Sequence, residues 1–377
     1  MRIYVGTPGF EAALRAELAP SATRVLVPGV ISSDAPETDA PADPVFARQV
    51  LPEAADLGGA SVRALAEAAF ASVEGAIDRW PGAFALQAFA PPAPSSDEEP
   101  TALPSARATH TRARAARRAG ARGASPTASG TRDGGLASRA ALVERELLAL
   151  LGERRKRASR RRLATLASAD FGEQVLLVQL LLIARDHLLV SAAAPRALHR
   201  GGFDLAPWPA GAPPVADDRA PPSRAYGKLE EAFAWMAAEP RAGQTCVDLG
   251  AAPGSWTYAA ARRGAAVLAV DRAALAPAVA RLPGVTSVAG NAFTYEPPGP
   301  VDWLLSDVIC EPARAIALVD AWLPRSRNLV VTVKFKGRDQ YPALAALSPI
   351  FDRARPTFAR VKHLAHNKNE VTVMISR

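Results

Sequence analysis

Residues 245–258 read TCVDLGAAPGSWTY, and residues 267–271 read VLAVD. The first stretch begins as an apolar strand around Asp248 and continues through a glycine-rich turn into a helix expected to start near Trp256. The second stretch is another buried strand, and it ends in an acid. The order strand, glycine-rich turn, helix, strand and acid predicts one half of a doubly wound nucleotide-binding fold.

The turn itself differs from a phosphate-binding loop. Residues 250–255 read GAAPGS rather than G-x-G-x-x-G, Pro253 stiffens the turn, and no lysine is present to meet a phosphate. A ligand without phosphates fits better, and S-adenosylmethionine (SAM) is the obvious candidate; an ordinary tight turn between a strand and a helix is the alternative. Asp271, at the tip of the second strand, is placed to accept hydrogen bonds from ribose hydroxyls.

Four charged residues lie at the edges of other predicted elements. Lys228 begins an amphipathic helix, since apolar residues follow it at helical spacing. Asp307 and Lys334 end two apolar strands, at the edge where open α/β sheets bind ligands. Glu370 begins the last strand, which would run antiparallel to bring it to the same edge.

Five motifs occur along the C-terminal part of the chain in a fixed order, and they are SRAYGKL (223–229), DLGAAPGSW (248–256), SD (306–307), VK (333–334) and EVTV (370–373). In this order they resemble the FtsJ/RrmJ-type ribose 2′-O-methyltransferases. Within that family the chain most resembles the RlmM type, which methylates a cytidine ribose of bacterial 23S rRNA. The strong resemblance covers residues 222–377, and PGFEAALRAEL (8–18) and VFARQ (45–49) extend it more weakly.

The resemblance implies a catalytic Lys-Asp-Lys-Glu tetrad formed by Lys228, Asp307, Lys334 and Glu370. Lys334 is expected to be the base that takes the proton of the ribose 2′-hydroxyl, with Lys228 as a neighbouring cation that lowers its pKa. Asp307 would orient Lys334, and Glu370 would hold Lys228 or the ribose. Lys336 is the less favoured base, because the V-K pattern falls on Lys334.

The SAM site implied by the resemblance combines the glycine-rich turn with polar residues at strand ends. Its expected residues are Asp248, Gly250, Ala252, Pro253, Gly254, Ser255, Trp256, Asp271, Asn291 and Asp307. Packing at the helix start is the expected main role of Trp256. Two positions depart from the family pattern: Asn291 stands where an Asp near the adenine is usual, and Ala225 stands where RlmM-type proteins often have Ser. No metal is expected. His363 and His366 are expected to be ordinary surface residues of a polar loop.

The expected fold is α/β, with a Rossmann-like class I methyltransferase, doubly wound and mostly parallel, behind an α+β THUMP-like RNA-binding region. Residues 1–90 are expected to be an N-terminal α/β unit, 91–137 a disordered insertion rich in Arg, Pro and Ser, and 138–204 the THUMP-like part, including a hairpin at 174–193. Residues 205–221 read as a linker to the methyltransferase domain at 222–377.

The net charge of +8 is unevenly distributed along the 377 residues. Residues 107–162 hold sixteen Lys and Arg against four Asp and Glu, so the remainder of the chain is acidic. One basic patch suggests a polyanionic partner, and RNA, with 23S rRNA in first place, fits the resemblance; a solvated tail is the alternative. We expect neither a DNA nor a membrane partner. Two cysteines without a disulfide framework suggest the cytoplasm.

Three functions stay open at this stage. The first is RlmM-type 2′-O-methylation of 23S rRNA, and the second is FtsJ-like 2′-O-methylation of another RNA. The third is a non-catalytic RNA-binding or ribosome-assembly factor that retains the fold, against which the intact set of four charged residues argues. The oligomeric state and the methylated nucleotide are not predicted.

Overall fold

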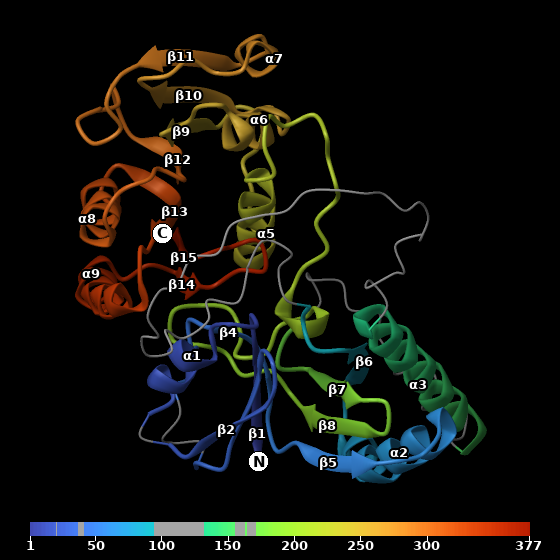
Figure 1. The fold of residues 1–377 in the computed structure, drawn as a ribbon. Helices are drawn as coiled ribbons and strands as arrows, with labels where there is room; N and C mark the ends of the chain where they lie inside the picture. The colour runs from blue at the N-terminus through green and yellow to red at the C-terminus, as the bar shows by residue number, and fades with distance from the viewer. Residues whose placement is uncertain (20, 37–40, 94–131, 155–162, 164–170) are drawn as a thin grey trace, which may run out of the picture.

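The computed structural model describes residues 1–19, 21–36, 41–93, 132–154, 163 and 171–377. These residues fold into three sheets, two of four strands and one of seven, with helices packed on them (Figure 1). Figure 1 shows the seven-stranded sheet as one lobe and the two smaller sheets as another, with the long segment before α5 running between them.

The first sheet holds the N-terminal strands in the order β2-β3-β1-β4, all antiparallel. Its elements are β1 (Arg2–Gly6), α1 (Glu11–Glu17), β2 (Thr23–Val27), β3 (Val30–Ser33) and β4 (Ala47–Leu51). The second sheet has the order β5-β8-β7-β6. Its elements are β5 (Ala55–Gly58), α2 (Val62–Arg79), β6 (Ala83–Phe89), α3 (Arg132–Arg154), β7 (Val175–Ala184) and β8 (His187–Ala193).

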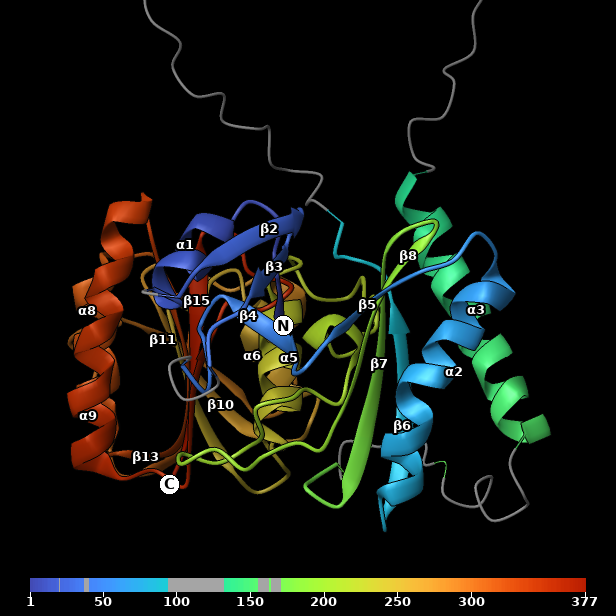
Figure 2. The same ribbon diagram turned by 90° about the horizontal axis from the view of Figure 1, so that it is seen from below.

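The expected unit 1–90 is therefore divided between two sheets. Its later part, β5, α2 and β6, joins the hairpin β7–β8, because β5 pairs with β8 and β6 pairs with β7. Helices α2 and α3 cover one face of this sheet together, as Figure 2 shows, and share one apolar core with it. Short-range patterns carry no information on which distant strand a given strand pairs with.

The region around the expected insertion differs from its predicted bounds. Helix α3 begins at Arg132, so the last residues of the expected disordered segment 91–137 are helical, and it ends at Arg154. Residues 94–131 and 155–162, which carry most of the basic patch, lie outside the described residues. The apolar run Val175–Ala184 is the buried strand β7, as the hairpin prediction required. None of the described helices is long and apolar enough to cross a bilayer.

The seven-stranded sheet has the order β11-β10-β9-β12-β13-β15-β14. The first five strands in this order, from β11 through β10, β9 and β12 to β13, run parallel. Strand β15 runs antiparallel to β13, and β14 pairs antiparallel with β15. The strands are β9 (Thr245–Leu249), β10 (Ala266–Asp271), β11 (Val285–Ala289), β12 (Val301–Ser306), β13 (Ser326–Lys334), β14 (Phe358–Lys362) and β15 (Glu370–Ser376). This confirms the expected doubly wound sheet and its antiparallel last strand.

Helices cover both faces of this sheet, with α8 and α9 on one side and α5 and α6 on the other (Figure 1). The helical elements are η3 (Pro209–Gly211), α5 (Tyr226–Met236), α6 (Ser255–Ala261), α7 (Pro277–Ala280), α8 (Pro312–Trp322), η4 (Arg338–Ala346) and α9 (Leu347–Ala354). Side chains alternate along β9: Val247 and Leu249 face α8 and α9, whereas Cys246 faces α5 and α6. Two covered faces explain why the strands are almost continuously apolar.

A buried ion cluster joins the N-terminal sheet to the edge of the large sheet. The carboxylate of Asp43 accepts hydrogen bonds from Arg360 Nε at 2.9 Å and pairs with Lys362 Nζ at 2.6 Å. The Arg360 and Lys362 side chains are only 4% and 3% exposed. Burial raises the pKa of Asp43, but the charges of Arg360 and Lys362 outweigh it and bring that pKa down to about 2.

The expectation that His363 is a surface residue is wrong. The structure buries its ring against Phe10 and Phe46 at this junction, and burial lowers its pKa to about 4. Thr7 Oγ1 and the carbonyl of Lys368 bond its two ring nitrogens at 3.0 and 2.7 Å. The polar composition of the loop suggested exposure, but the residues that cover His363, namely Thr7, Phe10 and Phe46, come from the N-terminal part of the chain, more than 300 residues away in sequence.

The expected linker is anchored to both lobes. Leu205 and Ala206 are buried, and the Ala206 carbonyl accepts a hydrogen bond from the Gln49 side chain at 2.9 Å. Further along, the Tyr226 hydroxyl bonds the backbone of Ala216 at 2.9 Å. The segment thus fixes α5, which carries Lys228, relative to the sheets that precede it.

Candidate active site

Four charged side chains predicted from separate motifs meet at the carboxyl edge of the large sheet. Lys228 Nζ lies 3.1 Å from Asp307 Oδ2 and 2.7 Å from Glu370 Oε1. Lys334 Nζ lies 3.0 Å from Asp307 Oδ1 and donates a hydrogen bond to the Asp307 carbonyl at 2.7 Å. Asp307 is therefore the centre of the cluster, with one ammonium group on each side.

Strand order and register bring these residues together. Asp307 directly follows β12, which lies beside β13, and β13 ends at Lys334. The antiparallel register of β13 and β15 places Glu370 directly opposite Lys334. Lys228 comes from the first turn of α5, a helix that packs on β15 and on α6. Four segments far apart in sequence thus supply one side chain each.

Thr332 is a site residue that sequence reasoning missed. Its hydroxyl donates a hydrogen bond to Asp307 Oδ1 at 2.7 Å, and it is fully buried. A signal for it existed, because residues two apart in a strand lie on the same face, and Thr332 precedes Lys334 by two positions. Thr332 helps to fix the orientation of the carboxylate that both lysines contact.

The two lysines near the end of β13 differ in their surroundings. Lys336 is 81% exposed and pairs with Glu311 at the surface. The Lys334 side chain is 20% exposed, and it contacts Asp307. Lys228, on the other side of Asp307, is still more enclosed: burial alone would lower its pKa, but the carboxylates of Asp307 and Glu370 raise it above the usual range. Lys228 is consequently a fixed cation.

An open cavity of about 340 Å³ lies over the glycine-rich turn and reaches this cluster. Of the residues predicted for the cofactor, those that line it are Asp248, Gly250, Ala252, Pro253, Ser255, Trp256, Asp271 and Asp307. Lys334 lines it as well, so the cavity and the charged cluster are continuous. Acidic side chains are frequent in its wall: Asp271 and Asp307 line it beside Asp248, and Asp307 is paired there with Lys334.

Two of the predicted cofactor residues lie outside the wall of this cavity. Gly254 packs under the turn, where a Cβ would come within 2.9 Å of Val279 Cγ1. Asn291 caps the turn after β11, and its Oδ1 accepts the Phe293 N–H at 3.1 Å. Asp271 does line the cavity, and its two carboxylate oxygens accept the N–H groups of Ala252 and Ala273 at 3.0 and 2.9 Å.

Trp256 and Ser255 connect the turn to the segment that precedes Lys228. The Trp256 side chain is buried, and its indole N–H donates a hydrogen bond to the Ala225 carbonyl at 2.8 Å. The hydroxyl of Ser255 donates to the Ser223 carbonyl at 3.1 Å and accepts the Ser223 N–H at 3.0 Å. Trp256 therefore packs at the start of α6 and also lines the cavity, while Ser223 is a lining residue that the sequence reasoning did not single out.

Gly250 is required by the geometry of the turn. Its φ is +75°, and a Cβ there would lie 2.8 Å from Val308 Cβ. We expect Gly250→Ala to lower the free energy of unfolding by about 1–3 kcal/mol, since it adds backbone strain to a steric clash. Urea unfolding would measure this, with Gly299→Ala as the matched control, because a Cβ at Gly299 meets no atom within 4 Å. An equal effect at both positions would contradict the prediction.

Asp248 is the basis of a pH prediction. Burial raises its pKa to about 7, although the Thr257 hydroxyl donates a hydrogen bond to it at 2.6 Å. Because the folded-state pKa lies above the unfolded value, the stability that neutral Asp248 confers is complete near pH 4 and is lost as the pH rises through 7. The midpoint of thermal unfolding should fall less between pH 5 and 8 in Asp248→Asn than in the wild type. Identical slopes would refute this assignment.

A second, wider cavity of about 690 Å³ opens on the other side of Lys334. Its wall includes Ile309, Arg314, Lys334, Lys336 and Glu370. Lys334 and Ile309 line both cavities and so mark the place where they meet.

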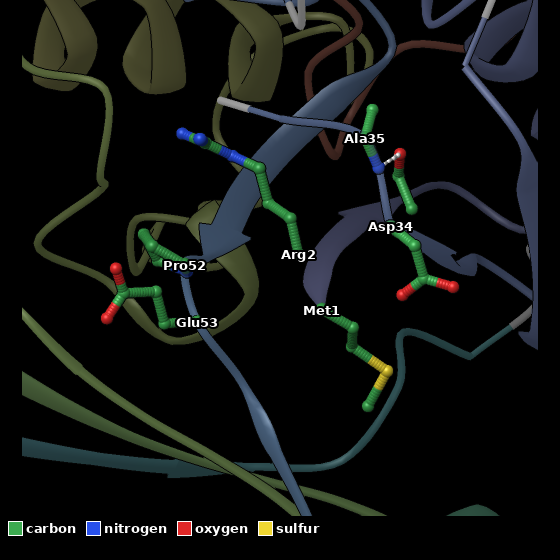
Figure 3. Close-up of a pocket in the computed structure, with 7 residues that line it drawn as sticks. Met1, Arg2, Asp34, Ala35, Pro52 and Glu53 are labelled. Atoms are coloured by element: carbon green, nitrogen blue, oxygen red, sulfur yellow. Dashed lines mark hydrogen bonds between the residues drawn. The ribbon is translucent and has the colours of Figure 1, made fainter. Parts of the chain in front are cut away.

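A third cavity lies far from this site. It is open, measures about 240 Å³, and lies at the end of β1 in the first sheet, where Arg2, Asp34 and Glu53 are part of its wall (Figure 3). No residue predicted for the site lies there.

Comparisons with known proteins agree with this geometry. Residues 221–333 match the FtsJ-like methyltransferase family. Ribosomal RNA large subunit methyltransferase M of Pseudomonas putida (strain GB-1) is 35% identical over 216 residues, which cover 52% of this chain and 59% of that protein. The protein of the same name from Pseudomonas syringae pv. syringae (strain B728a) is 37% identical over 51% of this chain and 58% of its own length. That from Thauera aminoaromatica is 32% identical over 50% and 56%.

The aligned region spans somewhat more than half the length of these curated relatives. The matched family segment includes the glycine-rich turn, Lys228 and Asp307, and the sheet order is that of a doubly wound α/β fold. Residues 221–333 thus match the FtsJ-like methyltransferase family and lie in a Rossmann-like, doubly wound α/β domain.

Proposed function

We propose that this protein transfers the methyl group of SAM to a ribose 2′-hydroxyl of RNA. The observation that supports it best is the cluster of Lys228, Asp307, Lys334 and Glu370 at the place where two cavities meet. One cavity suits the methyl donor and the other suits the acceptor. A methyl group can pass directly between two ligands only where their sites adjoin, and positioning of this kind lowers a barrier by several kcal/mol.

The first cavity fits SAM in charge and in shape. SAM supplies an already activated methyl group on a positively charged sulfur and carries no phosphate. The carboxylates of Asp271 and Asp307 in the wall favour a cation, and the turn offers no lysine to a phosphate. Asp248, Gly250, Ala252, Pro253, Ser255 and Asp271 would hold the nucleoside and amino acid parts, with Asp271 accepting from ribose hydroxyls. Gly254 and Asn291 would act through the shape of the turns that they support.

The charged cluster would move the proton. Lys334, in its neutral form, takes the proton of the 2′-hydroxyl as the oxygen attacks the methyl carbon. Asp307 orients Lys334 through its carboxylate and its carbonyl, and Thr332 orients Asp307. Lys228 stays charged and, held by Asp307 and Glu370, fixes the position of the Asp307 carboxylate that orients Lys334.

The substrate is inferred from the relatives and from the basic segment. The curated relatives are named for the ribosomal RNA of the large subunit, so 23S rRNA is the first candidate, with a cytidine as the nucleotide. The sheet of β5 to β8, with α2 and α3, would serve as the THUMP-like RNA-binding part, and the cytoplasm is the compartment where rRNA is made. Another RNA substrate for the same chemistry is the second candidate.

Methyl transfer from labelled SAM to an unmodified 23S rRNA transcript tests the proposal. We expect label in the RNA, and 2′-O-methylcytidine after digestion to nucleosides. A tRNA transcript in parallel separates the two candidate substrates. SAM binding without transfer to any RNA would refute the enzymatic function and favour the non-catalytic alternative.

A further inference from the structure

The cavity on the far side of Lys334, here called the acceptor cavity, has a wall suited to one nucleotide. It is lined by Ile309, Cys310, Glu311, Arg314, Lys334, Phe335, Lys336, Lys368, Asn369 and Glu370. We propose that it takes a single unpaired RNA nucleotide whose base or sugar packs on Ile309, while its phosphates lie on the neighbouring cations. This inference rests on the proposed function and adds that the target nucleotide must be unpaired when it binds.

Ile309 is the unusual feature of this wall. Its side chain is 85% exposed, whereas no other large apolar side chain among the described residues exceeds 41%. It lies two residues after Asp307, on the loop between β12 and α8, and it lines both cavities. An apolar side chain that projects between a donor site and an acceptor site is suited to pack on the flat face of a base or on a ribose, and packing there removes it from water.

The charges around Ile309 suit the backbone of the same nucleotide. Three cationic side chains besides the base Lys334, those of Arg314, Lys336 and Lys368, outnumber the two carboxylates Glu311 and Glu370. Glu370 is already paired with Lys228, and Glu311 with Lys336 at the open side. The Arg314 guanidinium lies 3.7 Å from the centre of the Phe293 ring, which holds it in place beside the cavity. Phosphate groups would thus meet a net positive wall.

The enclosed position of the Lys334 amine favours an unpaired nucleotide over a duplex as the ligand of the acceptor cavity. The side chains of Lys334, Lys228 and Glu370 are only 20%, 11% and 10% exposed. A cavity of about 690 Å³ holds a nucleotide, but it is far smaller than an RNA helix. The 2′-hydroxyls of an RNA helix lie in its shallow minor groove, and the broad duplex around them would not fit into the cavity that leads to Lys334, so the target nucleotide must leave the helix to enter it.

Two kinetic measurements test this on the full-length protein. Once the labelled nucleotide is mapped, a complementary DNA oligonucleotide annealed across it should lower the methylation rate more than tenfold, and one annealed to a remote segment should not. Ile309→Ala should lower kcat/KM about tenfold, because most of the apolar contact is lost, whereas Ile309→Leu stays within about twofold. Because Ile309 lines the first cavity too, calorimetry should show whether SAM affinity changes, and in Ile309→Ala it should fall less than kcat/KM does.

The outcomes separate this inference from the function on which it rests. Equal methylation of the annealed and the free target, or full activity of Ile309→Ala, would overturn the inference while leaving the methyltransferase in place. If no RNA accepts a methyl group, binding of a fluorescein-labelled single-stranded oligocytidylate decides instead. Weaker binding by Ile309→Ala than by Ile309→Leu would support the acceptor cavity, and equal binding would refute it.

Discussion

Lys334→Ala should lower the rate of methyl transfer by about 10²- to 10⁴-fold, the usual contribution of a positioned general base. Lys334 Nζ is held by the carboxylate and the carbonyl of Asp307 at the point where the two cavities meet. Removal of the amine leaves the 2′-hydroxyl without a proton acceptor, while most of the wall of the first cavity stays intact. Single-turnover methylation measures the rate, and calorimetry should show SAM affinity within about tenfold of the wild type.

Lys334→Arg is the sharper variant for the role of the base. Arginine keeps the positive charge and can still bond Asp307, but a guanidinium does not give up its proton in proteins. We therefore expect Lys334→Arg to be as inactive as Lys334→Ala. Substantial activity of the arginine variant would show that charge alone is needed and would exclude a base at this position. Lys336→Ala serves as a comparison, since loss of an exposed cation of the acceptor cavity should raise KM more than it lowers kcat.

Asp43→Ala should destabilise the protein by about 3–5 kcal/mol, because it leaves two buried cations without their carboxylate. Arg360 and Lys362 are almost wholly enclosed, and Asp43 is the acidic partner of both. The N-terminal sheet is held to β14 through this cluster, so its loss should also loosen the loop that leads to Glu370. Urea unfolding monitored by tryptophan fluorescence measures the change, and Trp235 lies beside the cluster.

A surface pair provides the control for this prediction. Asp320 pairs with Arg353 on the outer helices, where the side chains are 47% and 63% exposed, so Asp320→Ala should cost at most about 1 kcal/mol. The pH dependence gives a further check. Because the folded-state pKa of Asp43 is lowered to about 2, the contribution of its carboxylate to the free energy of unfolding is complete above pH 4 and disappears as the pH falls through 2. Equal stability of Asp43→Ala and wild type at pH 7 would refute the assignment.

Local patterns predicted the doubly wound α/β fold and placed four charged residues at one edge of its sheet, and the resemblance to the FtsJ/RrmJ-type enzymes added the methyltransferase. Each of Lys228, Asp307, Lys334 and Glu370 begins or ends an element, and the carboxyl ends of parallel strands share one edge whatever the strand order. The fold prediction is confirmed by the strand order, and the catalytic role of the four residues stays a prediction. Lys334 could also be told from Lys336 by sequence, and their different surroundings agree with that choice.

Other features depend on contacts between distant segments. That His363 is buried and not on the surface follows from Phe10 and Phe46 closing over it, and no local pattern of a polar loop indicates that. The division of residues 1–90 between two sheets follows from the pairing of β5 and β6 with the hairpin β7–β8. Asn291 and Gly254 were predicted for the cofactor site, but neither lines the first cavity: Asn291 bonds the Phe293 N–H, and Gly254 packs against Val279.

The sequence by itself determined the chemistry that the chain can offer, because residue types, turn residues and hydrophobic periods are local properties. Only the tertiary structure decided how these groups meet. Strand register set Glu370 opposite Lys334, and the loop after β12 exposed Ile309 between two cavities. Register, burial and cavity walls depend on contacts between segments that are distant in sequence, and such contacts exist only once the chain has folded.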